Sequence, residues 1–486
     1  MAGDKLCLAI DASGKLNAVS ADDVKHFAEA GIRVLADSEI GPPHNADMFG
    51  RYAGDARVAL APTSTAQVSQ VLSYCNERQI GVVVQGGNTG VPGGALCQRG
   101  EVLLCLSDMK KVRHVDPVAG VLVADAGCVL ADLDDHVQQL GYIMPLDLGS
   151  RRRCMIGGNV STSAGGLRYL RYGSMHGNVL GVEAVLPDGR ILDALFTLKK
   201  DTSGYDVKQL FIGAEGTLGV VTAVAIALAP KPQATQLAVL GLGAFDKIEQ
   251  AFVRARQGLG EILSAFEFWD RRCDEIVVES MHYPSLLKSA HEFYVLIETR
   301  GSLMRHDAEK MSAFLDALHA DGLVDESCVL SAPDAMDAAW MFRSNMAAAH
   351  ARRGCMYVYD FSLPSQHKPS LLGAVKGHLS SLGLYGAADS PVLDVTIFGH
   401  IGDDNIHLQV IAREFGGAVE AAIEPWIYSW VGSHGGSVAA EHGLGAHKGQ
   451  FLKYSKSAAV IDTMKDLKRL LDPRGIMNPG KHICQA

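Results

Sequence analysis

The chain has 486 residues, of which 48% are hydrophobic and 20% charged, values that allow several globular domains with sizeable cores. Its net charge of −10 argues against a nucleic-acid-binding surface, and no apolar run reaches the roughly 18 residues that a membrane span needs. Ten cysteines are scattered without a Cys-x-x-Cys pair, which argues against a disulfide framework. The start, MAGDKLCLAIDASGK, lacks the features of a signal or transit peptide. We therefore expect a soluble protein of the cytoplasm or the mitochondrial matrix.

After an N-terminal segment over residues 1–54, the pattern predicts a first domain of mixed helices and strands over residues 55–232. A capping pair, Ser64 and Gln67, starts a helix whose apolar residues recur at helical spacing. A short buried strand, GVVVQ, follows and runs straight into glycines. The strand GVLVADAG and a helix closed by a glycine come next. The stretch Ala227–Gln233, ALAPKPQ, is typical of a linker.

Residues 233–425 show a different pattern, in which strand-like runs are separated by longer amphipathic helices. This pattern favours an α+β domain with helices on one side of an antiparallel sheet. Residues 426–486 are predicted to form a C-terminal segment with one helix, which ends at the turn-forming sequence DPRGIMNPGK. The expected apolar face of that helix consists of Val460, Ile461, Met464, Leu467, Leu470 and Leu471.

Three glycine-rich stretches lie in the first domain: VQGGNTGVPGG, the region Gly157–Gly181, and GAEGTLG. None fits the fingerprint of a Rossmann domain or of a Walker loop. Glycines nevertheless let successive backbone N–H groups converge on an anion and approach a pyrophosphate closely. One such loop is most often a tight turn, but three loops rich in Ser, Thr and Asn indicate a dinucleotide site.

The sequence VTIFGHIGDDNIHLQV places His400 and His407 on either side of a turn-like GDDN. A two-residue turn at Asp403 and Asp404 would set His400 directly opposite His407, with Cβ atoms about 5 Å apart, so that both rings could bind one cation. The alternative is a histidine pair on a sheet surface, hydrogen-bonded to one of these aspartates. The residues alone leave both interpretations open.

Eight motifs in chain order resemble the FAD-linked oxidase superfamily with the vanillyl-alcohol oxidase / p-cresol methylhydroxylase fold. They are PTSTAQVS, QGGNTGVPGG, IGGNVSTSAGGLRYLRYGSMHG, FIGAEGTLGVVT, LSAFEFWD, GHIGDDNIH, EHGLGAHK and DPRGIMNPGK. The pair GHIGDDNIH and EHGLG points to the D-2-hydroxyacid dehydrogenase branch, which includes D-2-hydroxyglutarate and D-lactate dehydrogenases. The resemblance covers nearly the whole chain. It implies a two-subdomain FAD-binding domain, an α+β cap domain with an antiparallel sheet and a metal-binding hairpin, and a C-terminal segment that completes the active site.

The resemblance also implies where FAD binds, in a noncovalent manner, although the sequence does not exclude a histidyl link. The loop QGGNTG would hold the pyrophosphate, and Asn478 would lie near the flavin. Glu215, Gly219 and Val221 would face the adenosine half. The implied FAD-binding residues are Gln85, Gly86, Gly87, Asn88, Thr89, Gly90, Pro145, Leu148, Gly149, Ser150, Gly157, Gly158, Ser163, Gly165, Gly166, Tyr172, Glu215, Gly219, Val221 and Asn478.

In the resembled branch, the residues that match His400, His407 and Glu441 bind a divalent metal, usually zinc. The residue that matches His442 is the catalytic base. Zinc accepts histidine nitrogen and carboxylate oxygen, and a catalytic zinc keeps one position open for substrate. The interpretation of the hairpin as a metal site therefore agrees with the resemblance.

The same resemblance implies a substrate pocket with one clear departure. Arg343 matches the clamp for the C1 carboxylate, and Gln409 stands where the branch has a substrate-binding Asn; the bland alternative for Arg343 is a solvated helix arginine. Ala347 and Val358 replace a Thr and a Lys of the hydroxyglutarate enzymes. We therefore expect D-lactate or a slightly longer D-2-hydroxy acid to match or exceed D-2-hydroxyglutarate in kcat/KM, unless an arginine such as Arg352 or Arg353 replaces the missing cation.

The expected function is the FAD- and divalent-metal-dependent oxidation of a D-2-hydroxy acid to the 2-oxo acid, with hydride transfer to the flavin. Expected partners are a small 2-hydroxy acid and an electron acceptor such as an electron-transfer flavoprotein, a quinone or a cytochrome. The sequence leaves open whether the protein forms a homodimer. Alternatives are an oxygen-using flavin oxidase, an ether-lipid synthase-like transferase, which the histidine motifs disfavour, and a zinc hydrolase, which the glycine loops disfavour.

Overall fold

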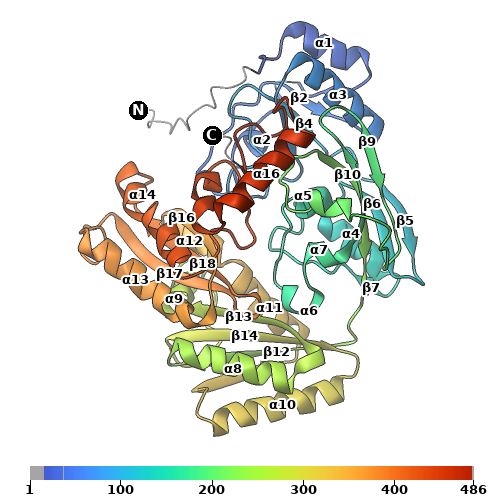
Figure 1. The fold of residues 1–486 in the computed structure, drawn as a ribbon. Coiled ribbons are helices and arrows are strands. Elements are labelled where there is room, and N and C mark those ends of the chain that lie inside the picture. Colours follow the sequence, from blue (N-terminus) through green and yellow to red (C-terminus); the bar gives the residue numbers. More distant parts are fainter. Residues whose placement is uncertain (1–15, 37, 484–486) are drawn as a thin grey trace.

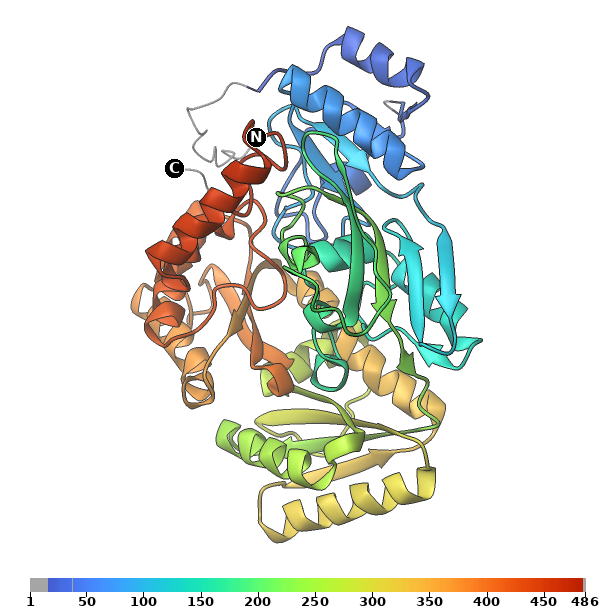
Figure 2. The ribbon, with the colours of Figure 1, turned by 45° about the vertical axis from the view of Figure 1, so that its right-hand side comes forward.

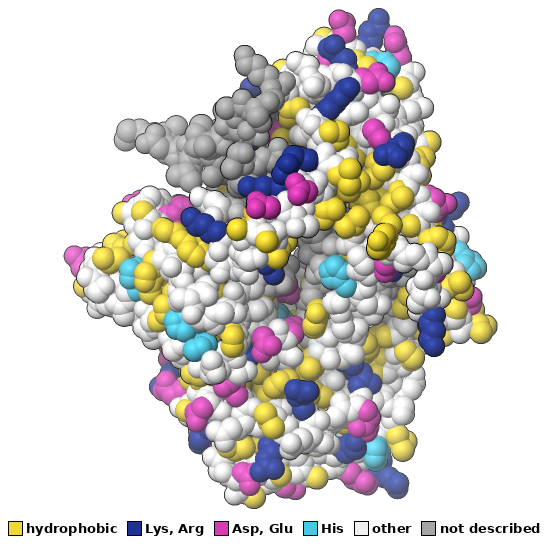
Figure 3. Space-filling model, in the orientation of Figure 1, with side chains coloured by type: hydrophobic (Ala, Val, Ile, Leu, Met, Phe, Trp, Pro, Cys, Tyr) yellow, Lys and Arg dark blue, Asp and Glu magenta, His cyan; other side chains and the backbone are white. Residues whose placement is uncertain are grey.

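The computed structural model describes residues 16–36 and 38–483. The expectation that the first 15 residues carry no targeting segment lies outside these ranges. Within them, no helix is both long enough and apolar enough to cross a membrane. On the face shown in Figure 3, acidic and basic side chains are interspersed.

The first sheet has four strands in the order β1-β2-β4-β3, and it carries the first glycine loop at one end. The strands are β1 (Arg33–Val34), β2 (Ala59–Ala61), β3 (Val82–Gln85) and β4 (Val102–Cys105). β4 runs parallel to both β2 and β3. Helix α3 (Thr65–Arg78) connects β2 to β3 and begins as predicted, because the side chain of Ser64 accepts a hydrogen bond from the backbone N–H of Gln67.

The second sheet has five antiparallel strands in the order β5-β6-β10-β8-β9. They are β5 (Val112–Asp116), β6 (Val121–Asp125), β8 (Val179–Val185), β9 (Ile191–Ala194) and β10 (Val220–Ala227). The predicted linker after β10 contains the short strand β11 (Ala229–Pro230), which pairs with β7 (Tyr142–Ile143). Helices α4 (Leu130–Gln138) and α5 (Ile156–Ser161) also belong to this part of the molecule.

The third sheet has seven strands in the order β15-β12-β14-β13-β17-β18-β16, and Figure 1 shows its strands β12, β13 and β14 at the opposite end of the molecule from β2 and β4. Neighbouring strands of this sheet are antiparallel, which confirms the predicted α+β cap. The strands are β12 (Ala234–Leu242), β13 (Leu263–Asp270), β14 (Phe293–Gly301), β15 (Glu326–Leu330), β16 (Cys355–Ser362), β17 (Val392–His400) and β18 (Asn405–Ala412).

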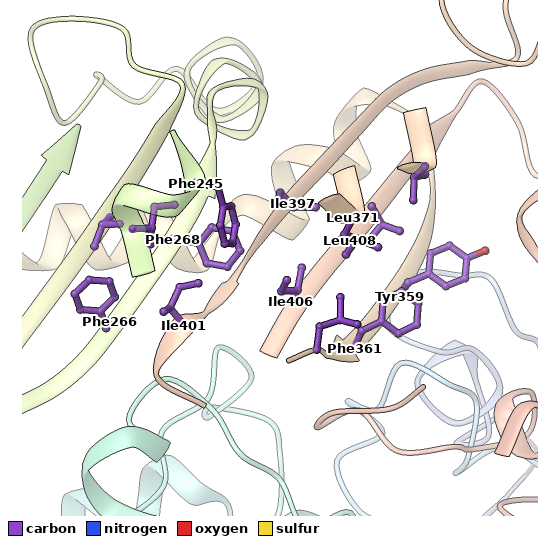
Figure 4. Packing of buried hydrophobic residues seen from close by; sticks show 14 of the residues in the cluster. Phe245, Phe266, Phe268, Tyr359, Phe361, Leu371, Ile397, Ile401, Ile406 and Leu408 are labelled. Carbon is purple, nitrogen blue, oxygen red and sulfur yellow. The ribbon is translucent and has the colours of Figure 1, made fainter. Parts of the chain in front are cut away.

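Helices cover both faces of this sheet, so the prediction of helices on one side is wrong. One core joins the sheet to α8 (Phe245–Gly258), α10 (Met304–Ala320) and α13 (Lys368–Ser381). A second core joins the other face to α9 (Arg271–Met281), α11 (Pro333–Ser344) and α12 (Met346–Arg353). Successive residues of β12 divide between the cores, with Ala238 in the first and Val239 in the second. The continuous apolar run of such a strand reflects burial on both faces. Figure 4 shows part of the first core.

The hairpin of β17 and β18 forms, but its register differs by two residues from the predicted one. His400 pairs with Asn405, and His407 pairs with Phe398. The connection has four residues rather than two, because a short 3₁₀ turn precedes Asp404, which adopts a left-handed conformation with φ of 66°. A shift of two residues keeps each side chain on its predicted face, since side chains alternate along a strand. The two histidines therefore remain neighbours, on a diagonal.

Helix α16 (Ala458–Leu471), red in Figure 2, packs Ile461 and Met464 against the first core of the cap sheet and Leu471 against the core of the second sheet. Its predicted apolar face is only partly buried: Leu470 is 76% exposed and Val460 is 42% exposed. The buried residue is Lys468, whose ammonium group donates to the backbone carbonyls of Thr217 and Met477 and also pairs with Asp472. This cation fixes the DPRGIMNPGK turn, which continues as a parallel partner of β3 at Val82.

A buried ion cluster joins the first half of the chain to the cap sheet. Arg168 donates two hydrogen bonds to Glu298 of β14, at 2.8 and 2.9 Å, and the indole of Trp340 donates a third. Arg300 also pairs with Glu298. Burial acts to raise the pKa of Glu298, but the two arginine charges outweigh burial and lower it to about 2. The carboxylate is therefore charged, and it holds the two parts of the molecule in one orientation.

Candidate active site

A cavity of about 480 Å³ lies between the glycine loops and the cap sheet. Its wall combines the loops after β3, around α5 and before β10 with residues of α12, β16, β17 and β18. The loop that follows Ala439 and the C-terminal turn complete the wall. Six of the eight motifs contribute residues to the wall of this cavity. The two that do not are PTSTAQVS and LSAFEFWD.

The glycine loops of this wall have free backbone donors and open space in front of them. Within the described chain, no N–H group of residues 86–90 donates to a protein acceptor. A Cβ added at Gly90, Gly149 or Gly158 would meet no atom within 4 Å, although all three line the cavity. A Cβ at Gly87, in contrast, would lie 2.0 Å from the carbonyl oxygen of Arg153, so only glycine allows the loops to approach each other there. The arrangement suits a large ligand with phosphate groups.

Most of the residues that the resemblance assigned to FAD line this cavity. They are Gly86, Gly87, Asn88, Thr89, Gly90, Leu148, Gly149, Ser150, Gly157, Gly158, Gly165, Glu215, Gly219, Val221 and Asn478. The predicted site residues that lie outside its wall are Gln85, Pro145, Ser163, Gly166, Tyr172, Arg343 and His400.

Several of these residues hold the loops together. The amide of Gln85 donates to the backbone carbonyls of Ala95 and His44, so it fixes the first glycine loop from behind. The carboxylate of Glu215 accepts from the N–H groups of Leu444 and Gly445, at 2.7 and 2.8 Å. Its charge therefore anchors the loop that presents Glu441 and His442. A contact of Glu215 with the adenosine half of FAD stays a prediction.

Three donor atoms converge at the end of the hairpin. The Nε2 atoms of His400 and His407 are 3.3 Å apart. The Oε1 atom of Glu441 lies 3.6 Å from the first of them and 3.4 Å from the second. Zinc binds such atoms at about 2.0–2.2 Å, so tetrahedral ligands are separated by about 3.3–3.6 Å. The triangle thus has the size that a single tetrahedral cation requires.

Asp360 lies close to the same group but is committed to other partners. Its Oδ2 atom accepts from the N–H groups of Ala440, Glu441 and His442 at 2.8–3.0 Å, and Oδ1 accepts from the amide of Asn405. Burial acts to raise the pKa of Asp360, but neighbouring histidine charges and hydrogen bonds hold it well below its usual range. Because Asp360 has these donors, we assign it to holding the loop rather than to binding a cation.

A second carboxylate positions His400. The Oε1 atom of Glu267 is 2.8 Å from Nδ1 of His400, which directs Nε2 of the ring toward Glu441 and His407. The other oxygen of Glu267 is 2.7 Å from Nη2 of Arg343. Glu267 is 1% exposed and Arg343 is 5% exposed, so this chain of charges is buried. Arg343 also stacks on Phe398, a residue of the cavity wall.

Glu267 and Asp360 were not predicted as site residues. Each is a single acidic residue within an apolar strand, in LSAFEFWD and in MYVYDF. A carboxylate buried in a sheet must have charged or hydrogen-bonding partners, so these strands carried a usable signal. An acidic residue in an apolar strand does not show which residues it will contact, however. The partners here come from distant segments: β17, α11 and the loop at residues 440–442.

The part of the cavity wall formed by α12, β16 and β18 contains the residues that depart from the branch pattern. Ala347, Val358 and Gln409 all line it. The proposed substitutes for the missing lysine do not reach it: Arg352 donates to the backbone carbonyl of Ser280, and Arg353 pairs with Asp394. Neither arginine belongs to the cavity wall.

Residues 231–482 match the family of FAD linked oxidases, C-terminal domain, and residues 56–195 match the FAD binding domain family. A D-2-hydroxyglutarate–pyruvate transhydrogenase of Saccharomyces cerevisiae is 46% identical over 90% of this chain and 89% of its own length. The mitochondrial D-2-hydroxyglutarate dehydrogenase of Bos taurus is 44% identical over 93% and 81%. A putative mitochondrial D-lactate dehydrogenase of Schizosaccharomyces pombe is 42% identical over 90% and 84%.

Solved structures with the same fold are more distant in sequence. p-Cresol methylhydroxylase superposes with a TM-score of 0.74 at 16% identity, over 96% of this chain and 98% of its own. Alkyldihydroxyacetonephosphate synthase superposes with a TM-score of 0.71 at 16% identity, over 97% and 86%. These likenesses confirm the predicted fold. The chain belongs to the FAD-linked oxidases, in the branch that contains the D-2-hydroxyglutarate dehydrogenases.

Proposed function

We propose that the protein oxidises a D-2-hydroxy acid to the 2-oxo acid, using noncovalently bound FAD and one divalent metal ion. The observation that carries the proposal is the triangle of His400, His407 and Glu441 donors, with sides of 3.3–3.6 Å. Two of these residues line the same cavity as the glycine loops. A metal donor set and a dinucleotide cradle in one cavity suit a metal-assisted flavin dehydrogenase.

The donor chemistry favours zinc among common divalent metals, because imidazole and carboxylate are ligands that zinc accepts. Bound here, the metal would supply a Lewis acid for the substrate 2-hydroxyl, and FAD would supply the acceptor for the C2 hydride. The backbone N–H of Gly166 donates to Oε2 of Glu441 at 2.8 Å. Glu441 can therefore offer its other oxygen, Oε1, to the metal position.

His442 is the candidate base. Its ring is stacked on that of His407, with centroids 5.2 Å apart, and its Nε2 lies 3.9 Å from Oε1 of Glu441. Burial lowers the pKa of His442 below its usual value, although the charge of Asp360 acts in the opposite direction. A neutral imidazole at this place can accept the hydroxyl proton of a substrate bound beside the metal position.

Arg343 and Gln409 are the candidates for the substrate carboxylate. Gln409 is 2% exposed and lines the cavity, where the N–H groups of its side-chain amide can donate to a carboxylate. The Nε group of Arg343 lacks an acceptor in the described chain. Because Arg343 lies behind the wall against Phe398, we expect it to act on the C1 carboxylate through a small rearrangement of that ring.

Metal removal tests the proposal. We expect the purified protein to carry about one divalent metal per chain, with the flavin bound by the separate glycine loops. Dialysis against a strong chelator should abolish reduction of the flavin by a D-2-hydroxy acid while the yellow protein keeps its FAD. Added zinc should restore the reaction. Full activity in protein that metal analysis shows to be metal-free would refute the metal part of the proposal.

A further inference from the structure

A second, small cavity adjoins the large one at Val358 and His442. Its volume is about 20 Å³, which suits about one water molecule or one carboxylate oxygen. The two cavities share Phe49, Val91, Pro92, Val358 and His442 in their walls. Val358 and the candidate base His442 therefore lie between the two cavities. A distal group of a substrate would have to pass Val358 to enter the small cavity.

The positive charge that borders the two cavities is unevenly distributed. Among the described lining residues, the large cavity has neither Lys nor Arg, whereas the small one has Arg51 and Lys448. Arg51 is paired with Glu420 and Glu424, at 3.1 and 3.3 Å. Lys448 is 5% exposed, and its Nζ has no hydrogen-bond partner in the described chain.

The carboxylates around Lys448 hydrogen-bond to other groups. Asp47, which also lines the small cavity, accepts from the backbone N–H groups of Phe49 and Tyr52. Asp360 is taken up by four N–H groups, and Glu424 bonds to His447, Tyr359 and Arg51. Burial lowers the pKa of Lys448, and the nearby charges of Asp360 and Glu424 only partly oppose this. A buried ammonium group without an acceptor is costly, so this position favours an anion or an ordered water.

We propose that Lys448 and the small cavity form a subsite for the distal carboxylate of a D-2-hydroxy dicarboxylic acid. Val358 replaces the lysine of the hydroxyglutarate enzymes, and Lys448, on the far side of Val358, would supply the missing positive charge. The inference rests on the proposed function, since it takes the 2-oxo acid product to be a ligand of the large cavity. It differs from the expectation from the sequence that D-lactate or a slightly longer D-2-hydroxy acid matches or exceeds D-2-hydroxyglutarate as substrate.

Product binding to the oxidised holoenzyme, followed by the change in flavin absorbance, tests this subsite without turnover. The probes are 2-oxoglutarate, which has a distal carboxylate, and pyruvate, which has none. We expect Lys448→Met to raise the Kd for 2-oxoglutarate by about 10- to 100-fold, because a buried charge-assisted hydrogen bond is lost. The Kd for pyruvate should change by less than about threefold, since pyruvate does not reach Lys448. Lys453→Met, at an exposed lysine of the same segment, is the matched control.

A second variant leaves Lys448 in place. Val358→Glu would give the ammonium group of Lys448 a carboxylate partner within the protein. It should therefore also raise the Kd for 2-oxoglutarate and leave the Kd for pyruvate nearly unchanged. If these variants raise the Kd of both acids equally, or raise neither Kd, the proposal of the subsite is overturned. A wild-type protein that binds pyruvate as tightly as 2-oxoglutarate would overturn it too. Binding of neither acid by the wild type would instead remove the proposed function, together with the inference that depends on it.

Discussion

His407→Ala should abolish the metal site while leaving the flavin in place. The substitution removes one corner of the donor triangle with His400 and Glu441, and two protein ligands hold zinc far more weakly than three. Reduction of the flavin by a D-2-hydroxy acid should slow by about a thousandfold or more, because a Lewis acid contributes several kcal/mol to such a step. Metal analysis, flavin content and anaerobic stopped-flow absorbance measure the three quantities on one preparation.

His306→Ala provides the control for this substitution, because His306 is an exposed histidine on the remote helix α10. It should keep the metal content and the rate of the wild type. A His407→Ala protein that retains both one metal per chain and its reduction rate would contradict the metal assignment. Loss of FAD along with the metal would show that the hairpin supports the cofactor as well, against the separation proposed above.

His442→Asn should lower the rate of flavin reduction by about a hundredfold to ten-thousandfold, the usual contribution of a general base. His442 is not part of the donor triangle, so metal and FAD should both remain bound. The backbone N–H of residue 442 still donates to Asp360 in the variant, which keeps the loop in position. Added imidazole should restore part of the rate in the variant and leave the wild type unchanged. A variant that loses its metal, or one that reacts at the wild-type rate, would contradict the role of His442 as base.

The hairpin shows how far a sequence pattern defines a site. The alternation of side chains placed His400 and His407 on one face of the sheet, and this held although the register shifted by two residues. The register itself depends on the turn, and the sequence GDDN permits both a two-residue turn and the observed 3₁₀ turn with Asp404 in a left-handed conformation. The face of the sheet on which each histidine lies was therefore predictable, whereas the residue paired with it on the neighbouring strand was not.

Contacts between distant segments could not be predicted in the same way. Glu267 and Asp360 were visible as acids within apolar strands, but their hydrogen bonds to His400 and to the loop at residues 440–442 arise from the order of strands in the sheet. Lys448 was visible only as part of the motif EHGLGAHK. Among the described residues its ammonium group has no hydrogen-bond partner, because Glu424 and Asp360 bond to other groups, and no spacing in the sequence reveals this.

Anaerobic mixing of the holoenzyme with the two enantiomers of one 2-hydroxy acid tests the central claim most directly. The proposed function predicts that D-2-hydroxyglutarate or D-lactate bleaches the flavin absorbance in a single turnover and yields the 2-oxo acid in equal amount. The L-enantiomer should reduce the flavin at least about a hundredfold more slowly, because the metal position, the base and the flavin must lie on defined sides of C2. A flavin that stays oxidised with the D-acids, or that is reduced equally by both enantiomers, would contradict the account.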